Sequence, residues 1–126
     1  MLVVDDEEHI LNALSGYFDH LGYIVDCART LEEAEALLDL HRYQIVLADL
    51  RLTGIEGVEG LEIISYAREK SPGTRVALLT AYGTPAIRQE ALRRGADAFL
   101  NKPQPLADIA RIVATLVSGF PVFSAL

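Results

Sequence analysis

The sequence Ile45-Val46-Leu47-Ala48-Asp49 is an apolar run of strand length that ends in one carboxylate. A buried strand gains nothing from an aspartate at its end, and the glycine-containing residues 50–60 that follow are typical of a loop. The backbone therefore delivers one acid to the exposed end of a buried sheet. Ligands of open α/β sheets bind at this end of the strands, so the run predicts where a functional site lies.

The bulk composition is typical of one small globular domain. The chain has 126 residues, of which 51% are hydrophobic and 23% charged, enough for a single core. Its net charge of −7 argues against direct nucleic-acid binding, because such surfaces are basic. One cysteine excludes an internal disulfide, and no apolar run approaches the roughly 18 residues of a membrane span. We expect a cytoplasmic domain with no direct nucleic-acid or membrane binding.

Strands and helices alternate along the chain, and turn signals such as Pro85 and Gly95 mark helix ends. The strands are apolar throughout, which indicates burial on both faces and a parallel sheet between helices. Right-handed crossovers limit the topology to a few doubly wound orders, and we predict an α/β fold with five strands in the order 2-1-3-4-5. The predicted strands cover residues 2–4, 23–28, 45–49, 75–80 and 96–101, and the last helix covers residues 106–117.

Two single residues carry minor expectations about packing. Cys27 is expected to be a small filler inside the second strand. Ile112 points away from the apolar stripe Leu106, Ile109, Ala110, Val113, Leu116 and Val117, so it is expected to be exposed.

Polar residues end the apolar runs of four predicted strands. Asp5 and Asp6 follow the first strand, Asp49 ends the third, Thr80 ends the fourth, and Lys102 follows the fifth. Because the carboxyl ends of parallel strands lie on one edge of the sheet, we expect these side chains to meet there.

Three clustered acids repel one another, by about 4 kcal/mol for two charges about 4 Å apart at an effective dielectric of about 20. Lys102 supplies one positive charge, and a divalent cation removes the remaining deficit of two. Oxygen ligands without histidine or cysteine favour Mg²⁺, or Mn²⁺, over zinc. Magnesium sites often include a phosphate, and a carboxylate can attack phosphorus as a nucleophile. The cluster therefore indicates phosphoryl transfer, which depends on positioning and charge neutralisation.

Four motifs, in this order and spacing, resemble the receiver domain of two-component response regulators. They are Val3-Val4-Asp5-Asp6-Glu7, the strand-terminal Asp49, Leu79-Thr80-Ala81-Tyr82-Gly83 and Lys102-Pro103. The resemblance implies a flavodoxin-like fold. We expect a receiver domain over residues 1–118, with residues 119–126 forming a C-terminal tail or the start of a linker. Residues 54–60 are longer than the corresponding family segment and are expected to form a loop beside the site.

The resemblance also implies which residues bind the metal. Asp49 would be both the phosphoacceptor and a direct Mg²⁺ ligand, together with Asp6. Asp5 would act mainly through a water molecule. The main-chain carbonyl of Arg51 would complete the protein ligands.

A second group of residues would hold and sense the phosphoryl group. Lys102, the Thr80 hydroxyl and the Ala81 N–H would contact it, and Lys102-Pro103 would form a cis peptide. Phe99 stands where the family carries its switch aromatic. Its ring would turn into space that Thr80 vacates, which changes the surface of the fourth helix, fifth strand and fifth helix.

The expected function is a phosphorylation switch that receives its phosphoryl group from a histidine kinase or phosphotransfer protein, rather than a turnover enzyme. A homodimer through the fourth helix, fifth strand and fifth helix is compatible with this function. One alternative is an aspartate-nucleophile phosphohydrolase, but such an enzyme needs an acid two residues past its nucleophile, where Arg51 stands. Another is a phosphorylation-independent binding module, against which the intact Asp6, Asp49, Thr80 and Lys102 argue.

Overall fold

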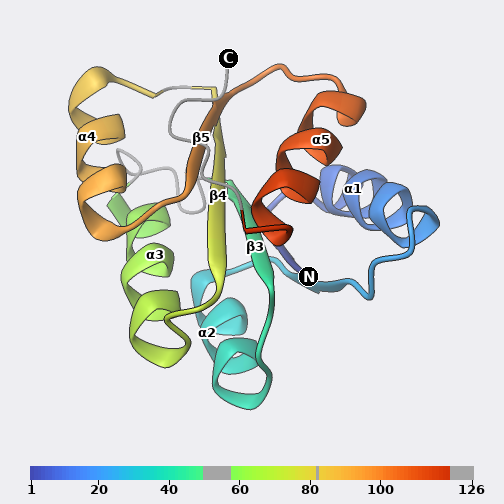
Figure 1. Ribbon diagram of the computed structural model, residues 1–126, viewed down its shortest axis with the longest axis horizontal. Coiled ribbons are helices and arrows are strands. Elements are labelled where there is room, and N and C mark those ends of the chain that lie inside the picture. The colour runs from blue at the N-terminus through green and yellow to red at the C-terminus, as the bar shows by residue number, and fades with distance from the viewer. Residues whose placement is uncertain (50–57, 82, 120–126) are drawn as a thin grey trace.

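The computed structural model describes residues 1–49, 58–81 and 83–119, in which strands and helices alternate (Figure 1). The strands are β1 (Leu2–Val4), β2 (Asp26–Ala28), β3 (Ile45–Asp49), β4 (Arg75–Thr80) and β5 (Ala98–Asn101). The helices are α1 (Glu8–His20), α2 (Leu31–Leu40), α3 (Val58–Lys70), α4 (Pro85–Arg94) and α5 (Leu106–Val117). None of these helices combines the length and the apolar character that crossing a membrane requires.

The strands form one parallel sheet in the order β2-β1-β3-β4-β5, which confirms the predicted topology. In its register, Val4 of β1 lies beside Ala48 of β3, and Thr80 of β4 lies beside Asn101 of β5. The chain therefore leaves these four strands at one edge of the sheet. This carboxyl edge is where the residues that follow each strand come together.

Helices cover both faces of the sheet, with α1 and α5 on one face and α2, α3 and α4 on the other (Figure 1). Successive side chains of β3 alternate between the two cores, since Leu47 packs with Phe18 of α1 and Val46 packs with Ile64 of α3. All four are almost fully buried. Burial on both faces explains why the strand sequence is apolar throughout.

Side-chain caps and one left-handed residue set several helix ends. Thr30 Oγ1 accepts a hydrogen bond from the Glu33 N–H at 3.1 Å, and Glu33 Oε1 accepts one from the Arg29 N–H at 2.8 Å. Thr84 caps α4 in the same way, through the Ile87 N–H at 3.2 Å. Gly95 ends α4 with a φ of 105°, a conformation that favours glycine.

Two strand boundaries and one helix boundary differ from the prediction. β2 begins at Asp26 rather than residue 23, because its partner β1 offers only three residues for pairing. β5 begins at Ala98 rather than residue 96. The expected loop over residues 54–60 overlaps α3, which begins at Val58, while residues 54–57 lie outside the described residues.

Both minor packing expectations were wrong. Cys27 is exposed, because β2 is the edge strand of the sheet. Ile112 is buried, with 8% of its surface exposed. The helix α5 is rotated so that Ile109, Ile112, Val113 and Leu116 form its buried stripe, while Ala110 and Val117 are only partly buried. A stripe at positions i, i+3, i+4 and i+7 satisfies helical periodicity as well as the predicted one.

Candidate functional site

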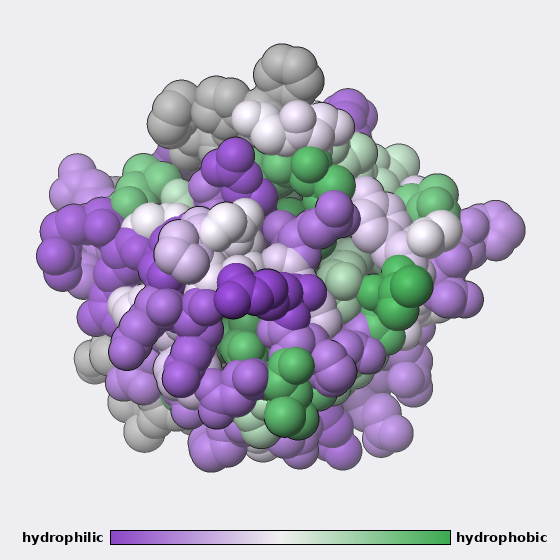
Figure 2. All heavy atoms as spheres, turned by 60° about the horizontal axis from the view of Figure 1, so that its bottom comes forward, coloured by the Kyte–Doolittle hydropathy of each residue, from purple (hydrophilic) through white to green (hydrophobic). Residues whose placement is uncertain are grey.

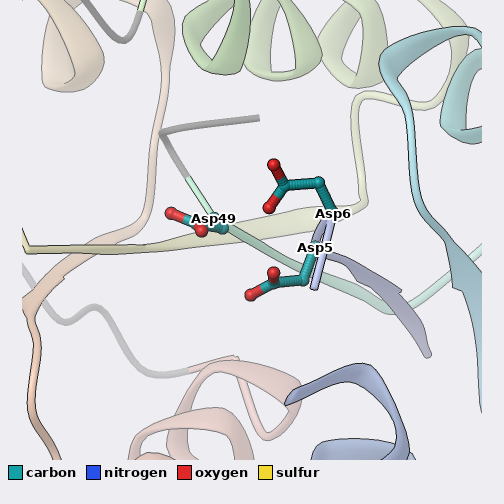
Figure 3. Close-up of side chains that lie close together, drawn as sticks. All are labelled: Asp5, Asp6 and Asp49. Atoms are coloured by element: carbon teal, nitrogen blue, oxygen red, sulfur yellow. The ribbon is translucent and has the colours of Figure 1, made fainter. Parts of the chain in front are cut away.

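Three aspartates meet at the carboxyl edge of the sheet (Figure 3). Asp5 and Asp6 follow β1, and Asp49 is the last residue of the neighbouring strand β3. One carboxylate oxygen from each residue lies within 4.8 Å of the others. The sheet register causes this proximity, because Val4 pairs with Ala48 and the two chains leave the sheet side by side.

The three acids differ in their exposure. Asp5 and Asp49 are buried, with 1% and 3% of their surfaces exposed, whereas Asp6 is exposed. The Glu7 N–H donates a hydrogen bond to Asp5 Oδ1 at 2.9 Å, which orients that carboxylate. The site therefore has two buried carboxylates and one that faces solvent.

Among the residues that the structure describes, Lys102 is the cation of this site. Its Nζ lies 3.2 Å from Asp49 Oδ2 and 3.7 Å from Asp5 Oδ2. The Lys102 N–H donates a hydrogen bond to the Thr80 carbonyl at 2.7 Å, and the following peptide bond to Pro103 is cis, as expected. The hydrogen bond to Thr80 holds the backbone that carries the ammonium group toward Asp49.

The charges of the described residues of the site do not balance. Burial raises the pKa of Asp5 above 3.8, the neighbouring Asp49 and Asp6 raise it further, and the Glu7 N–H and Lys102 lower it. Three carboxylates against one ammonium leave a deficit of two charges when all are ionised. The donor set contains only oxygen, which matches Mg²⁺ and related hard cations.

The predicted switch residues lie at the same edge. Thr80 ends β4 and is buried, with 1% of its surface exposed, and Ala81 directly after it is exposed. Phe99 lies on β5 beside Leu78 and is 2% exposed, so its ring occupies an inward position. The fourth predicted metal ligand, Arg51, lies outside the described residues.

A groove beside Lys102 was not anticipated from the sequence. It has a volume of about 300 Å³ and lies between α1 and the start of α5. The sequence feature that could have indicated this groove is Leu106, an apolar residue at the start of a helix. In the structure, 37% of the Leu106 surface is exposed. The lining residues are His9, Ile10, Ala13, Leu14, Leu79, Lys102, Pro103, Gln104, Leu106 and Ile109.

Comparison with known proteins gives consistent results. A family model described as the response regulator receiver domain matches residues 1–114. Among curated proteins, the chain is similar to the response regulator protein PilR of Pseudomonas aeruginosa, with 36% identity over 114 residues, which are 90% of this chain and 25% of PilR. It spans less than two-thirds of the length of the curated relatives that it matches.

Solved structures match over nearly the whole chain. One is a response regulator from Burkholderia pseudomallei with a phosphorylated aspartic acid, a calcium ion and citrate. The TM-score is 0.81 at 30% identity, covering 93% of this chain and 67% of that one. Another is the beryllofluoride-activated NtrC4 receiver domain dimer, with a TM-score of 0.78 at 32% identity, covering 94% of this chain and 93% of that one.

Proposed function

This chain belongs to the family of response regulator receiver domains, and from that premise we propose that it is a switch in which Asp49 accepts a phosphoryl group. The observation that carries the proposal is the position of Lys102 Nζ, 3.2 Å from Asp49 Oδ2, beside Asp5 and Asp6. A buried carboxylate next to an ammonium group and two further acids suits a phosphoryl acceptor that needs charge neutralisation.

The donor would be a phosphohistidine of a histidine kinase or phosphotransfer protein. A carboxylate oxygen of Asp49 forms the new bond to phosphorus, the P–N bond to the imidazole breaks, and the released imidazole takes up a proton. Lys102 would pair with a phosphoryl oxygen as a point charge. The Thr80 hydroxyl and the Ala81 N–H would hydrogen-bond to the other oxygens.

A divalent cation, Mg²⁺ or Mn²⁺, would be held by Asp6 and Asp49 directly, by Asp5 through water, and by the main-chain carbonyl of Arg51. The all-oxygen donor set and its charge deficit of two support this assignment. When bound, the cation neutralises the charge that the phosphoryl oxygens bring to the three acids. Asp5 keeps its orientation through the Glu7 N–H.

The output of the switch would be the surface of α4, β5 and α5. Thr80 would move toward the phosphoryl group, and the Phe99 ring would fill the space that it leaves. Phosphorylated chains would then pair as homodimers through this surface. A receiver domain over residues 1–118, followed by a tail or linker over residues 119–126, remains our prediction; α5 ends at Val117 and residues 120–126 lie outside the described residues.

The groove between α1 and α5 suits an amphipathic helix of the donor protein. It is lined mainly by apolar side chains, and Lys102 and Pro103 form part of its wall. A helix docked in this groove would present its histidine next to the pocket that contains Asp49. The donor helix would thus bind on a surface that adjoins the site where Asp49 is phosphorylated.

A phosphohydrolase is the rival function. Its water-activating acid would occupy position 51, where this chain has an arginine. The aspartyl phosphate should therefore persist, which is the behaviour of a switch rather than of a turnover enzyme. A phosphorylation-independent binding module would have no need for Lys102 beside the acid cluster.

Intact-mass measurement after incubation with Mg²⁺ and acetyl phosphate tests the proposal. We expect wild type and the surface control Asp108→Asn to gain one phosphoryl group, and Asp49→Asn to gain none. Continuous release of phosphate over many turnovers would instead support the phosphohydrolase. An unchanged wild-type mass would support the binding module.

A further inference from the structure

Gly83 lies against the two buried residues of the predicted switch. A β-carbon built on Gly83 would stand 2.7 Å from Phe99 Cε1, 2.8 Å from Phe99 Cζ and 2.9 Å from Thr80 Cγ2. Favourable carbon–carbon contacts lie at about 3.5–4.0 Å, so these distances leave no room for a methyl group. The glycine backbone itself therefore forms one wall of the space that the Phe99 ring occupies.

The backbone conformation does not explain why this position is a glycine. Within the described residues, positive φ angles occur at Gly22, Gly95 and Gly119, but not at Gly83. Gly83 is also exposed, so burial of its own surface is not the reason. The constraint is the space beside Phe99 and Thr80.

Gly83 also connects this space to α4. The next residue, Thr84, caps that helix through the Ile87 N–H at 3.2 Å. A shift of the Gly83 backbone away from the Phe99 ring would therefore move the start of α4. The contact joins the end of β4, the ring on β5 and the first turn of α4.

We propose that Gly83 is a positioning residue of the switch, which allows the inward position of Phe99 because it has no side chain. The inference rests on the proposed function, because it assigns Gly83 a part in the movement of Thr80 and Phe99. A methyl group at position 83 would push the Phe99 ring outward and would reduce the response of α4 to phosphorylation. The effect acts mainly through Phe99, so at least half of it should disappear when that ring is removed.

The test compares Gly83→Ala with Gly73→Ala, a matched control because nothing lies within 4 Å of the β-carbon built on Gly73 and its φ is not positive. NMR of ¹³C-labelled phenylalanine rings, with Phe99→Leu to assign the Phe99 signal, reports ring exposure through a soluble paramagnetic probe. We expect a several-fold increase in the paramagnetic relaxation of Phe99 in Gly83→Ala and no change in Gly73→Ala. Beryllofluoride with Mg²⁺ should shift the Phe99 signal less in Gly83→Ala than in wild type.

A double variant separates this mechanism from a general folding defect. Gly83→Ala should lower the urea midpoint of wild type, and at least half of that loss should vanish in the Phe99→Leu background. A Gly83→Ala protein that folds only when combined with Phe99→Leu would also support the inference. Unchanged Phe99 exposure, or an equal loss of midpoint in both backgrounds, would overturn it. A failure of the proposed function would be seen in a different measurement: wild type would gain no phosphoryl group in the intact-mass experiment.

Discussion

At the amino edge of the sheet, Asp97 is held by two arginines, whereas at the carboxyl edge the described part of the chain offers one lysine to a cluster of three aspartates. Asp97 Oδ2 accepts hydrogen bonds from Arg68 Nη2 and from the Val76 N–H at 2.8 Å, and its Oδ1 lies 3.3 Å from Arg75 Nη1. Arg68 also donates to the carbonyls of the adjoining turns, among them Gly95. The protein itself therefore supplies every charge that this acid needs.

The carboxyl edge lacks such compensation among the described residues. Asp5 and Asp49 are as buried as core residues, and within the described ranges Lys102 is the cation that pairs with both. Figure 2 turns the amino edge forward, where hydrophilic side chains predominate and hydrophobic patches are small and separate. The two edges therefore differ in charge: the fold neutralises Asp97, whereas the described acids of the carboxyl edge keep a charge deficit, which is the property expected of acids that bind a cation.

The largest expected effect comes from breaking the amino-edge network. Asp97→Ala leaves Arg68 partly buried without its carboxylate, and should lower the free energy of unfolding by about 3 kcal/mol. The surface pair Asp108 and Arg111 offers the control, since Asp108→Ala should change that free energy by less than about 0.5 kcal/mol. Urea unfolding followed by circular dichroism measures both. A loss below about 1 kcal/mol for Asp97→Ala would show that the network is not a structural centre.

The opposite edge should instead gain stability from an added cation. Mg²⁺ at about 100 times its dissociation constant should raise the free energy of unfolding of wild type by about 2.7 kcal/mol. Asp49→Asn should lose most of this increment, whereas Asp97→Ala should keep it despite its lower baseline. Urea unfolding with Mg²⁺ or with EDTA measures the difference. Equal increments in wild type and Asp49→Asn would contradict the proposed metal ligands.

Asp5→Asn sharpens the contrast, because removal of this acid should stabilise the metal-free protein. In EDTA at pH 7 we expect a gain of about 1 kcal/mol, because the variant no longer buries this charge and no longer holds it beside Asp49 and Asp6. The folded-state pKa of Asp5 is raised above 3.8, so folding favours its protonated form. The advantage of the variant should therefore be full at neutral pH and should vanish as the pH falls through the folded-state pKa toward 3.8. A gain that is independent of pH would contradict this electrostatic cause.

Elements with a sequence signal at both ends were predictable to the residue. α4 runs from Pro85 to Arg94, between the two end signals Pro85 and Gly95, because proline favours the first helical position and glycine favours the left-handed end. The grouping of Asp5, Asp6, Asp49 and Lys102 was also predictable, because each follows or ends an apolar strand and parallel strands share one carboxyl edge. The chemical roles assigned to these residues remain proposals.

Features that depend on packing between distant elements were not predictable. The Arg68–Asp97 pair joins residues 29 positions apart, and its geometry depends on two turns that no motif specifies. The rotation of α5 that buries Ile112 depends on how the helix meets the sheet and α1. Gly83 belongs to a motif that the sequence shows, but its contact with Phe99 was not predictable, because it depends on where the ring of another strand lies.

The smallest expected effect concerns a second acid at the amino edge, Asp26, which accepts a hydrogen bond from a tyrosine. Tyr43, which is 8% exposed, donates a hydrogen bond to Asp26 Oδ2 at 2.6 Å, and burial together with this bond raises the pKa of Tyr43 above 10. Tyr43→Phe should lower the free energy of unfolding by up to about 1 kcal/mol at pH 8.

This difference should depend on alkaline pH in a defined direction. A raised folded-state pKa stabilises the folded protein fully below pH 10, and the benefit is lost as the pH rises through that pKa. The stability difference between wild type and Tyr43→Phe should therefore shrink above pH 10. Tyr66, whose pKa is raised to about 12 mainly by its hydrogen bond to Asp39, is present in both proteins, so the difference isolates Tyr43. A constant difference up to pH 11 in urea unfolding would mean that the hydroxyl contributes through packing rather than through its proton.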